Sequence, residues 1–358
     1  MPVVGHVRDT VRLRRSDCSR PGIRRVRRGR GFVYVDDLTE SPISDAQTLA
    51  RIATLAVPPA WRDVWICPHP NGHIQAVGTD ARGRKQYRYH DRWRARRDQE
   101  KFDKMLELAR RLPALRQVTG RHLLDAEPSR RRVLAGAVQL LDRGFFRIGS
   151  EEYANENGTY GLATIRKSHV TLHPRSRLVF DYTAKGGKRR LESIVDPLVY
   201  GLVAELKRRR GGGDELLAYK EHGRWVDVRS EDINAYIKAV TGGDFSAKDF
   251  RTWSATVLAA VGVAVTGEAV SSMAARRRAV NRAIQEVSFY LGNTPAVCRA
   301  SYIDPRVFDL FDAGVTVAGA LDALGEVDLG EPATQGPVEA AVVELLGGRA
   351  RAGARRAA

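Results

Sequence analysis

The feature that most constrains the fold is a change of pattern along the chain near residues 93–104. Before it, residues 31–90 form short alternating segments separated by turn signals, including an Asn71-Gly72 pair typical of a tight hairpin. After it, apolar residues recur mainly at helical spacing. At 358 residues the chain is long enough for two domains. The sequence therefore predicts an α+β fold, with a small N-terminal antiparallel β-sheet domain containing helices and a larger, mainly helical domain containing a small β-sheet.

The boundaries follow from composition. We place an N-terminal β-rich domain at residues 1–98 and a second domain at residues 99–325. After residue 325 the chain consists largely of Ala, Gly, Glu and Arg, so we expect a flexible tail over residues 326–358. Within the second domain, we expect strands over residues 164–172 and 178–182, with a hairpin turn following the second strand.

The charge of the chain is strongly unbalanced. Fifty-nine Lys and Arg residues stand against 42 Asp and Glu, giving a net charge of +17 and a pI near 10.2. Ten arginines lie in a basic arm over residues 8–30, which we expect to be a solvated flank, with contact along phosphates as the alternative. Such an excess predicts an anionic partner, with nucleic acid as the leading candidate. No apolar run approaches the roughly 20 residues that span a bilayer, so we expect a cytoplasmic protein without membrane contact.

Cysteine usage indicates a reducing compartment. The three cysteines are Cys18, Cys67 and Cys298, which are too few and too widely spaced for a disulfide framework. Cys67 lies near His69 and His73, but this spacing matches no common zinc pattern. A glycine-rich nucleotide loop is not evident either. We therefore expect neither a metal nor a cofactor.

A helix–turn–helix is predicted over residues 291–302. Gly292 suits the end of one helix, while Thr294 and Pro295 suit the cap and first position of the next. Asn293 then lies on the turn, and Tyr302 lies about two turns into the second helix. Tyr302 alone is compatible with a packing aromatic or with a nucleophile directed at a phosphate.

Three cationic residues upstream of this turn are further candidate site residues. Arg147 lies in an apolar segment and is costly to bury without an anionic partner, which could be Glu151 or Glu152. Lys185 lies at the predicted hairpin tip, where a lysine is usually solvated. Arg251 falls in the first turns of a helix opened by a capping box.

The strand before the change of pattern also carries polar chemistry. Alternation places Tyr87 and Tyr89 on one face, and Gln86, Arg88 and His90 on the other. Cationic and amide groups interleaved with tyrosines suit contact with phosphates and base edges. The alternative is an ordinary amphipathic edge strand.

Taken in order, the five candidates resemble the catalytic set of type IB DNA topoisomerases, in particular the small poxvirus-like and bacterial form. The matching segments are Phe146-Arg147-Ile148-Gly149, Phe180-Asp181-Tyr182-Thr183-Ala184-Lys185, Lys248-Asp249-Phe250-Arg251-Thr252-Trp253 and Leu291-Gly292-Asn293-Thr294-Pro295, with Tyr302 downstream. The resemblance covers residues 30–320, including the strand with Gln86, Tyr87 and Tyr89.

The resemblance implies an isomerase that relaxes supercoiled duplex DNA through a 3′-phosphotyrosyl intermediate, without ATP or metal. It implies the tyrosine recombinase/topoisomerase IB catalytic fold and a monomeric, nucleoid-associated enzyme. The implied catalytic residues are Tyr302 as nucleophile, Lys185 as general acid, and Arg147, Arg251 and Asn293 as phosphate ligands. The implied DNA contacts are Gln86, Tyr87, Tyr89 and Tyr153.

Several positions depart from the family pattern. Asn293 stands where His is often found, Ala184 where Gly is common, and Trp253 where Tyr is frequent. Lys188 competes with Lys185 on the same hairpin. A lysine contact near Tyr153 is replaced by Ser150, which affects the expected site preference.

Two other functions stay open. Tyrosine recombinases share a similar fold and nucleophile, but usually carry His three residues before the second arginine, where this chain has Lys248. A non-catalytic DNA-binding protein would explain the charge and the tyrosines, but would leave the ordered catalytic set to coincidence.

Overall fold

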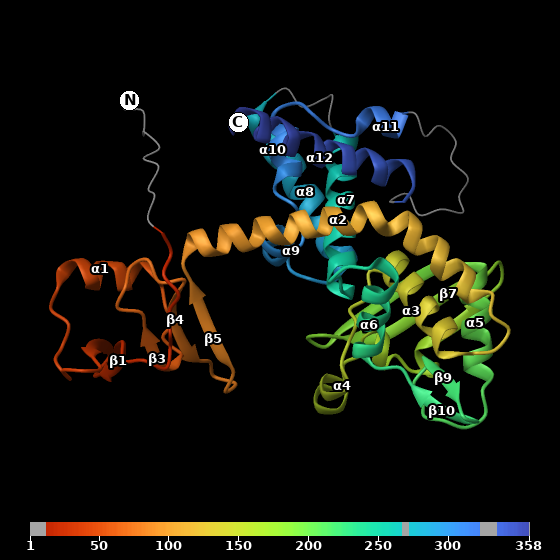
Figure 1. Cartoon of the computed structure of the whole chain (residues 1–358), viewed down its shortest axis with the longest axis horizontal. Helices are drawn as coiled ribbons and strands as arrows, with labels where there is room; N and C mark the ends of the chain where they lie inside the picture. The colour runs from red at the N-terminus through yellow and green to blue at the C-terminus, as the bar shows by residue number, and fades with distance from the viewer. Residues whose placement is uncertain (1–11, 267–271, 323–334, 358) are drawn as a thin grey trace. The chain divides into compact units, whose positions relative to one another are not determined.

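The computed structural model describes residues 12–266, 272–322 and 335–357. The chain divides into two compact units, residues 1–100 and 101–358 (Figure 1). The first contains an antiparallel sheet, and the second is mainly helical with two small sheets. The predicted α+β fold class is therefore confirmed.

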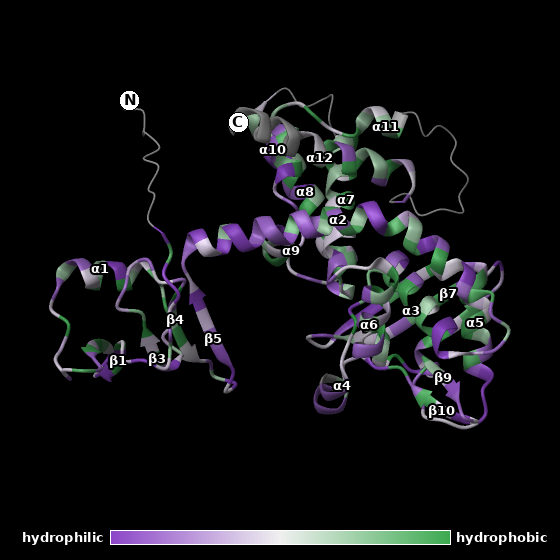
Figure 2. Ribbon diagram, in the orientation of Figure 1, coloured by the Kyte–Doolittle hydropathy of each residue, from purple (hydrophilic) through white to green (hydrophobic). Residues whose placement is uncertain are grey.

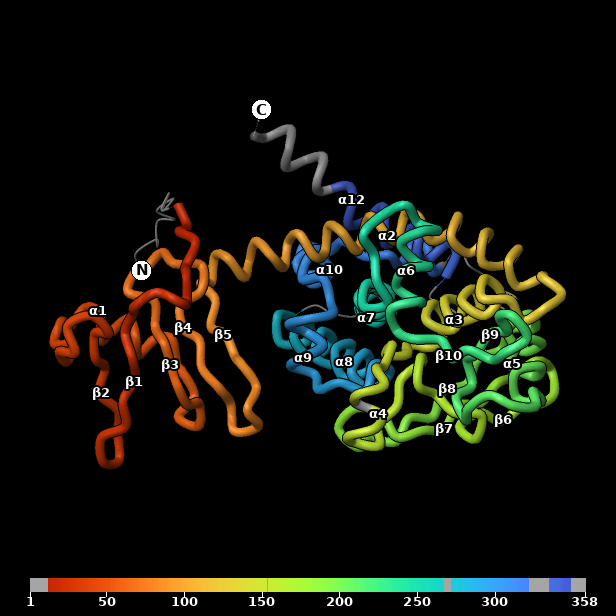
Figure 3. Tube along the Cα trace, turned by 60° about the horizontal axis from the view of Figure 1, so that its bottom comes forward, coloured from red at the N-terminus to blue at the C-terminus, as the bar shows by residue number. Residues whose placement is uncertain are grey.

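The first unit is built on a five-stranded antiparallel sheet with strand order β2-β1-β3-β4-β5, whose strands run side by side in Figure 3. The elements are β1 (Ile23–Arg28), β2 (Gly31–Asp36), α1 (Ala46–Thr54), β3 (Arg62–Ile66), β4 (Ile74–Thr79) and β5 (Lys85–Tyr89). The predicted Asn71-Gly72 turn joins β3 to β4. A small core forms from Ile23, Ile52, Val64, Ile66 and Ala76. Strand β5 lies at the edge of the sheet.

Strand β1 occupies part of the segment predicted to be a solvated basic arm. It pairs with both β2 and β3, so Ile23–Arg28 is an internal strand. Arg25 is buried because its guanidinium donates to the carbonyl oxygens of Val57, Pro58 and Trp61, at 3.2, 3.1 and 2.7 Å. Hydrogen bonds from main-chain acceptors make burial of this cation affordable. The solvated-arm prediction is thus wrong for Ile23 and Arg25, whereas Arg24, Arg27 and Arg28 are exposed.

The second unit is organised by helices. Helix α2 (Asp91–Leu123) is continuous over 33 residues, contains Pro113, and begins in the first unit, where its first turns are strongly hydrophilic (Figure 2). The other helices are α3 (Arg130–Gly144), α4 (Glu151–Asn157), α5 (Pro197–Arg208), α6 (Ser230–Thr241), α7 (Ala247–Val265), α8 (Met273–Leu291), α9 (Pro295–Ser301), α10 (Arg306–Asp312), α11 (Ala318–Asp322) and α12 (Pro337–Ala357). Helix α7 is buried over most of its length and contacts α3, α6, α8, α10, α11 and α12.

Two antiparallel sheets accompany these helices. One has the order β6-β7-β8, and the other pairs β9 with β10. Their strands are β6 (Val170–His173), β7 (Arg177–Ala184), β8 (Lys188–Val195), β9 (Ala218–Glu221) and β10 (Arg224–Asp227). The strand predicted over residues 164–172 is shorter than expected, because Ile165 O accepts a hydrogen bond from Leu216 N at 2.7 Å and this part of the chain leaves the sheet.

The C-terminal helix corrects the expected tail over residues 326–358. Val338, Val342 and Leu346 lie four residues apart and are fully buried against the core of the second unit. Pro337–Leu346 is therefore a packed part of the fold. Composition concealed this stripe, because alanine and glycine surround it. Residues 326–334 lie outside the part of the chain that the structure describes.

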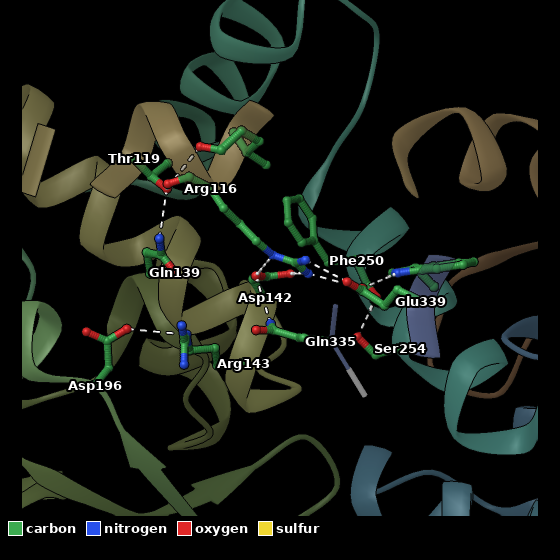
Figure 4. A network of polar contacts seen from close by, with 12 residues as sticks. Arg116, Thr119, Gln139, Asp142, Arg143, Asp196, Phe250, Ser254, Gln335 and Glu339 are labelled. Carbon is green, nitrogen blue, oxygen red and sulfur yellow. Dashed lines mark hydrogen bonds and ion pairs between the residues drawn. The ribbon is translucent and has the colours of Figure 1, made fainter. Parts of the chain in front are cut away.

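A buried polar network holds α12 in place (Figure 4). Arg116 of α2 binds Asp142 of α3 through Nε and Nη2, at 2.7 and 2.9 Å, and binds Glu339 of α12 through Nη1 and Nη2, at 2.5 and 3.0 Å. Trp253 Nε1 of α7 donates to Glu339 at 2.6 Å. Burial alone would lower the pKa of Arg116, but the hydrogen bonds to the two carboxylates outweigh it and raise the pKa. Three helices thus meet at one guanidinium, and α7 joins them through Glu339.

We predict that Glu339→Ala destabilises the protein by roughly 3 kcal/mol, since it removes one carboxylate from the buried Arg116 and leaves Trp253 Nε1 unpaired. Denaturant unfolding measures the change. Glu344→Ala on the exposed side of the same helix is the control, with an expected effect within about 0.5 kcal/mol. Equal destabilisation by the two variants would contradict the importance of the network.

Candidate active site

The turn between α8 and α9 is built as its sequence predicts. Gly292 ends α8 with φ at +64°, a left-handed conformation that glycine adopts easily. Thr294 caps α9 by accepting from Val297 N at 3.3 Å, and Pro295 is the first helical residue. These signals place Asn293 on the turn and Tyr302 immediately after the last residue of the short helix α9.

The main chain of Tyr302 is fixed against α7. Its carbonyl oxygen accepts a hydrogen bond from Thr256 Oγ1 at 3.3 Å, and its amide donates to Cys298 O at 3.0 Å. The side chain is half-buried. The phenol therefore extends from a hydrogen-bonded backbone position and is partly exposed.

Arg147 follows the left-handed residue Phe145, which ends α3 with φ at +54°. Its Nη2 donates to Gly292 O at 3.2 Å and to Asn293 Oδ1. Burial lowers the pKa of this arginine, and Tyr302 acts in the opposite direction. Both of these hydrogen bonds of Arg147 are thus made to the α8–α9 turn. The alternative of an ion pair with a neighbouring glutamate on α4 is not supported by these contacts.

Arg251 projects from the first turns of α7 and is only 4% exposed. The predicted capping box opens this helix, with Ser246 N donating to Asp249 at 2.8 Å. Arg251 Nη2 donates to Leu291 O at 2.8 Å, and Nη1 donates to Phe145 O. Its Cζ lies 5.5 Å from the centre of the Tyr302 ring. Burial, followed by repulsion from Arg147, lowers the pKa of Arg251 to about 10.

Two donor nitrogen atoms at this site could each make a further hydrogen bond. Arg251 Nε and Asn293 Nδ2 are buried and have no hydrogen-bond partner within the described part of the chain. Burial raises the pKa of the nearby Cys298 thiol, and Arg251, followed by Asn293, acts in the opposite direction. Buried donors without acceptors are unusual in a folded protein and suit an anion that binds from outside.

Lys185 lies where the sequence places it, on the turn between β7 and β8. Gly186 and Gly187 adopt φ values of +82° and +72°, which permit this tight turn. Lys185 is exposed, whereas the two arginines are largely buried. Lys188 begins β8 and pairs with Ala184. The choice of Lys185 as general acid stays a prediction.

The predicted DNA-contacting strand is β5 of the first unit. The rings of Tyr87 and Tyr89 stack with centroids 6.0 Å apart, so they share one face as predicted. Both tyrosines are exposed at about 40%. Gln86 donates to Asp80 Oδ2 at 3.0 Å. Tyr153 belongs to α4, but its side chain lies outside the described residues.

Arg190 and Glu192 were not identified as candidate site residues from the sequence. They lie two residues apart on β8, with side chains 14% and 12% exposed, and are hydrogen-bonded to each other. Burial raises the pKa of Glu192 to about 7, and Arg190 pulls it back. Burial also raises the pKa of Tyr182, on the adjacent strand β7, to about 12. The signal in the sequence was a pair of opposite charges two residues apart on a predicted strand, which places both side chains on the same face.

The Cys67 region has other contacts. His73 Nδ1 accepts from Ser16 N at 2.8 Å, and Ser16 Oγ lies 3.7 Å from Cys67 Sγ. Among the described residues, no group of three or more His, Cys, Asp or Glu side chains is placed to hold a metal ion. None of the described helices has the length and apolarity needed to cross a membrane.

Two family models match this chain. A family model for the catalytic core of eukaryotic DNA topoisomerase I matches residues 90–311, and one for the N-terminal domain of bacterial DNA topoisomerase IB matches residues 31–80. DNA topoisomerase 1B of Acanthamoeba polyphaga mimivirus is 30% identical over 301 residues, covering 81% of this chain and 87% of the viral protein.

Cellular relatives match a smaller part. DNA topoisomerase 1 beta of Arabidopsis thaliana is 25% identical over 45% of this chain and 16% of the plant protein. DNA topoisomerase 1 of Schizosaccharomyces pombe is 29% identical over 44% of this chain and 19% of the yeast protein. Because the catalytic-core model matches more than half of the chain and the mimivirus relative matches most of it, the chain belongs to the type IB DNA topoisomerase family.

Proposed function

We propose that this enzyme relaxes supercoiled duplex DNA by cutting one strand through Tyr302, allowing rotation and resealing the strand, without ATP or metal. The observation that carries the proposal is the cluster of a buried arginine, Arg251, and a half-buried arginine, Arg147, around a half-buried tyrosine. Arg251 lies 5.5 Å from the tyrosine ring, and its buried Nε has no partner among the described residues. This chemistry suits a phosphodiester.

The covalent step follows from the residue types. The phenolic oxygen of Tyr302 attacks the phosphorus and its proton is lost to water, while the bond from phosphorus to the 5′ oxygen breaks. The product is a 3′-phosphotyrosyl ester and a free 5′ hydroxyl. Because the energy of the broken phosphodiester is retained in the new ester, the reverse attack by the 5′ hydroxyl reseals the strand without a nucleotide cofactor.

Three side chains would bind the phosphate during this step. Negative charge accumulates on the non-bridging oxygens, and Arg147 and Arg251 offer planar guanidinium donors to them. Asn293 would add a hydrogen bond from Nδ2, which is buried without a partner in the described chain. In this proposal the arginines supply the positive charge that a metal supplies in other phosphoryl-transfer enzymes.

Lys185 is the proposed general acid that protonates the departing 5′ oxygen. Its support is positional: it lies at the tip of the β7–β8 hairpin, and β8 also carries Arg190 near the two arginines. Lys188 is the competing lysine of the same hairpin.

DNA contacts are proposed for Gln86, Tyr87, Tyr89 and Tyr153. The first three lie on the hydrophilic edge strand β5 (Figure 2). A net charge of +17 favours the approach of duplex DNA. We propose that the enzyme acts as a monomer, associated with the nucleoid in the cytoplasm.

We predict that Tyr302→Phe abolishes both plasmid relaxation and the covalent DNA adduct, because only the attacking oxygen is removed. Relaxation is measured on supercoiled plasmid in EDTA without ATP, and the adduct is measured by denaturing electrophoresis. Tyr200→Phe on α5 is the matched control and should retain both activities. An adduct formed by Tyr302→Phe would refute the assignment of the nucleophile.

We predict that Lys185→Ala slows single-turnover cleavage by about 100-fold or more, as expected for loss of a general acid. A DNA substrate with a 5′-bridging sulfur should restore the rate, because a thiolate leaves without protonation. Lys188→Ala should cleave the ordinary substrate at nearly the wild-type rate. The reverse result for the two lysines would move the role to Lys188.

A further inference from the structure

The inward face of strand β8 carries two charged residues beside the buried Ile194, while two aliphatic residues lie on the outward face. Leu191 and Val195 are 66% and 48% exposed, whereas the side chains of Arg190 and Glu192 are only 14% and 12% exposed. Alternation along a strand means that burying one set exposes the other. An ion pair buried in place of aliphatic side chains rarely gains stability. The charged face therefore calls for a role other than stabilising the sheet.

Arg190 reaches across to the end of α8. Its Nη1 donates to Phe289 O at 2.8 Å, and its Nη2 donates to Tyr290 O and to Glu192 Oε1. The guanidinium also lies against Gly292, where an added Cβ would come within 3.1 Å of Arg190 Nη1. Arg190 thus connects the hairpin that carries the proposed general acid to the turn that carries Asn293.

Three arginines share the end of this helix. The last carbonyl groups of an α-helix lack partners within the helix and carry partial negative charge. Here four consecutive carbonyl oxygens accept from arginines of three different elements. Arg190 binds those of residues 289 and 290, Arg251 binds that of residue 291, and Arg147 binds that of residue 292. Arg190 completes a set whose other two members are the proposed phosphate ligands.

We propose that Arg190 is a positioning residue, which sets the α8–α9 turn and its neighbouring arginines in the geometry needed for cleavage, with Glu192 as its buried counter-ion. Arg190 acts through Gly292 and the carbonyl oxygens of α8, and does not touch the DNA phosphate. This inference rests on the proposed strand-cleavage function.

The surroundings of Glu192 supply a second measurable property. The charged and titratable groups that act with it come from three elements: Arg190 on β8, Tyr182 on β7 and Arg251 on α7. Its pKa is raised to about 7 by burial, against the pull of Arg190 and then Arg251. The carboxylate that orients Arg190 therefore changes charge near neutral pH.

The first test is Arg190→Lys, which keeps the charge but loses the fork that spans two carbonyl oxygens. Single-turnover cleavage and religation should both slow by about 10- to 100-fold, as for a misplaced reacting group. The dissociation constant for the same duplex should change by less than about twofold. Arg189→Lys is the matched control, because the neighbouring Arg189 is 75% exposed and pairs with Asp181; its rates should match wild type.

Wild-type rates in Arg190→Lys, or an equal loss of rate in Arg189→Lys, would overturn the inference. Failure of the proposed function looks different, because the wild-type protein itself would then form no covalent adduct. Thermal unfolding of each variant at the assay buffer's pH shows whether a rate loss accompanies a folded protein.

The second test is Glu192→Gln, followed by the pH dependence of cleavage. In the wild type, the single-turnover rate should rise with pH through about 7, as Glu192 ionises and fixes Arg190. Glutamine keeps the shape and an acceptor oxygen but cannot ionise, so the rise of the cleavage rate through pH 7 should disappear in Glu192→Gln. A step of unchanged size in Glu192→Gln, or a wild-type profile without one, would contradict the role of Glu192.

Discussion

The proposed active-site cluster depends on how the end of helix α8 is capped. The last carbonyl oxygens of this helix accept hydrogen bonds from the guanidinium groups of Arg190, Arg251 and Arg147, which come from a strand, a helix and a loop. Main-chain carbonyl groups hold an arginine without cancelling its charge, whereas a carboxylate would cancel it. The cluster can therefore be rigid and still attract a phosphate. The cost of this arrangement shows in the pKa of Arg251, which burial, followed by repulsion from Arg147, lowers to about 10.

That cost is met by the surrounding helices. Helix α7 positions Arg251 and is itself buried among its neighbours, while Trp253 on the same helix binds Glu339 of α12. The guanidinium of Arg116 extends this contact to α2 and α3. A like-charged pair of arginines can persist when its scaffold is fixed from several sides. The C-terminal helix is thus part of the support of the site.

Local signals explain what the sequence predicted. Gly292, Thr294 and Pro295 specify their turn through backbone preferences and caps, which need no distant partner, and the predicted turn is found. Arg25 and α12 were mistaken for solvated segments, because their burial depends on acceptors far away along the chain, such as Val57 O for Arg25 and Arg116 for Glu339. The burial of Arg190 and Glu192 on strand β8 could not be predicted from hydrophobic alternation, since they share the inward face with the apolar Ile194.

The capping of α8 also limits which length changes the chain can tolerate. One residue added or lost within α8 would rotate every later carbonyl by about 100° around the helix axis. All three arginines would then face the wrong acceptors together, and Gly292 would leave the guanidinium packed against it. Substitutions on the exposed face of α8 carry no such penalty. Insertions and deletions among natural relatives should therefore avoid this helix, even where its surface sequence has diverged freely.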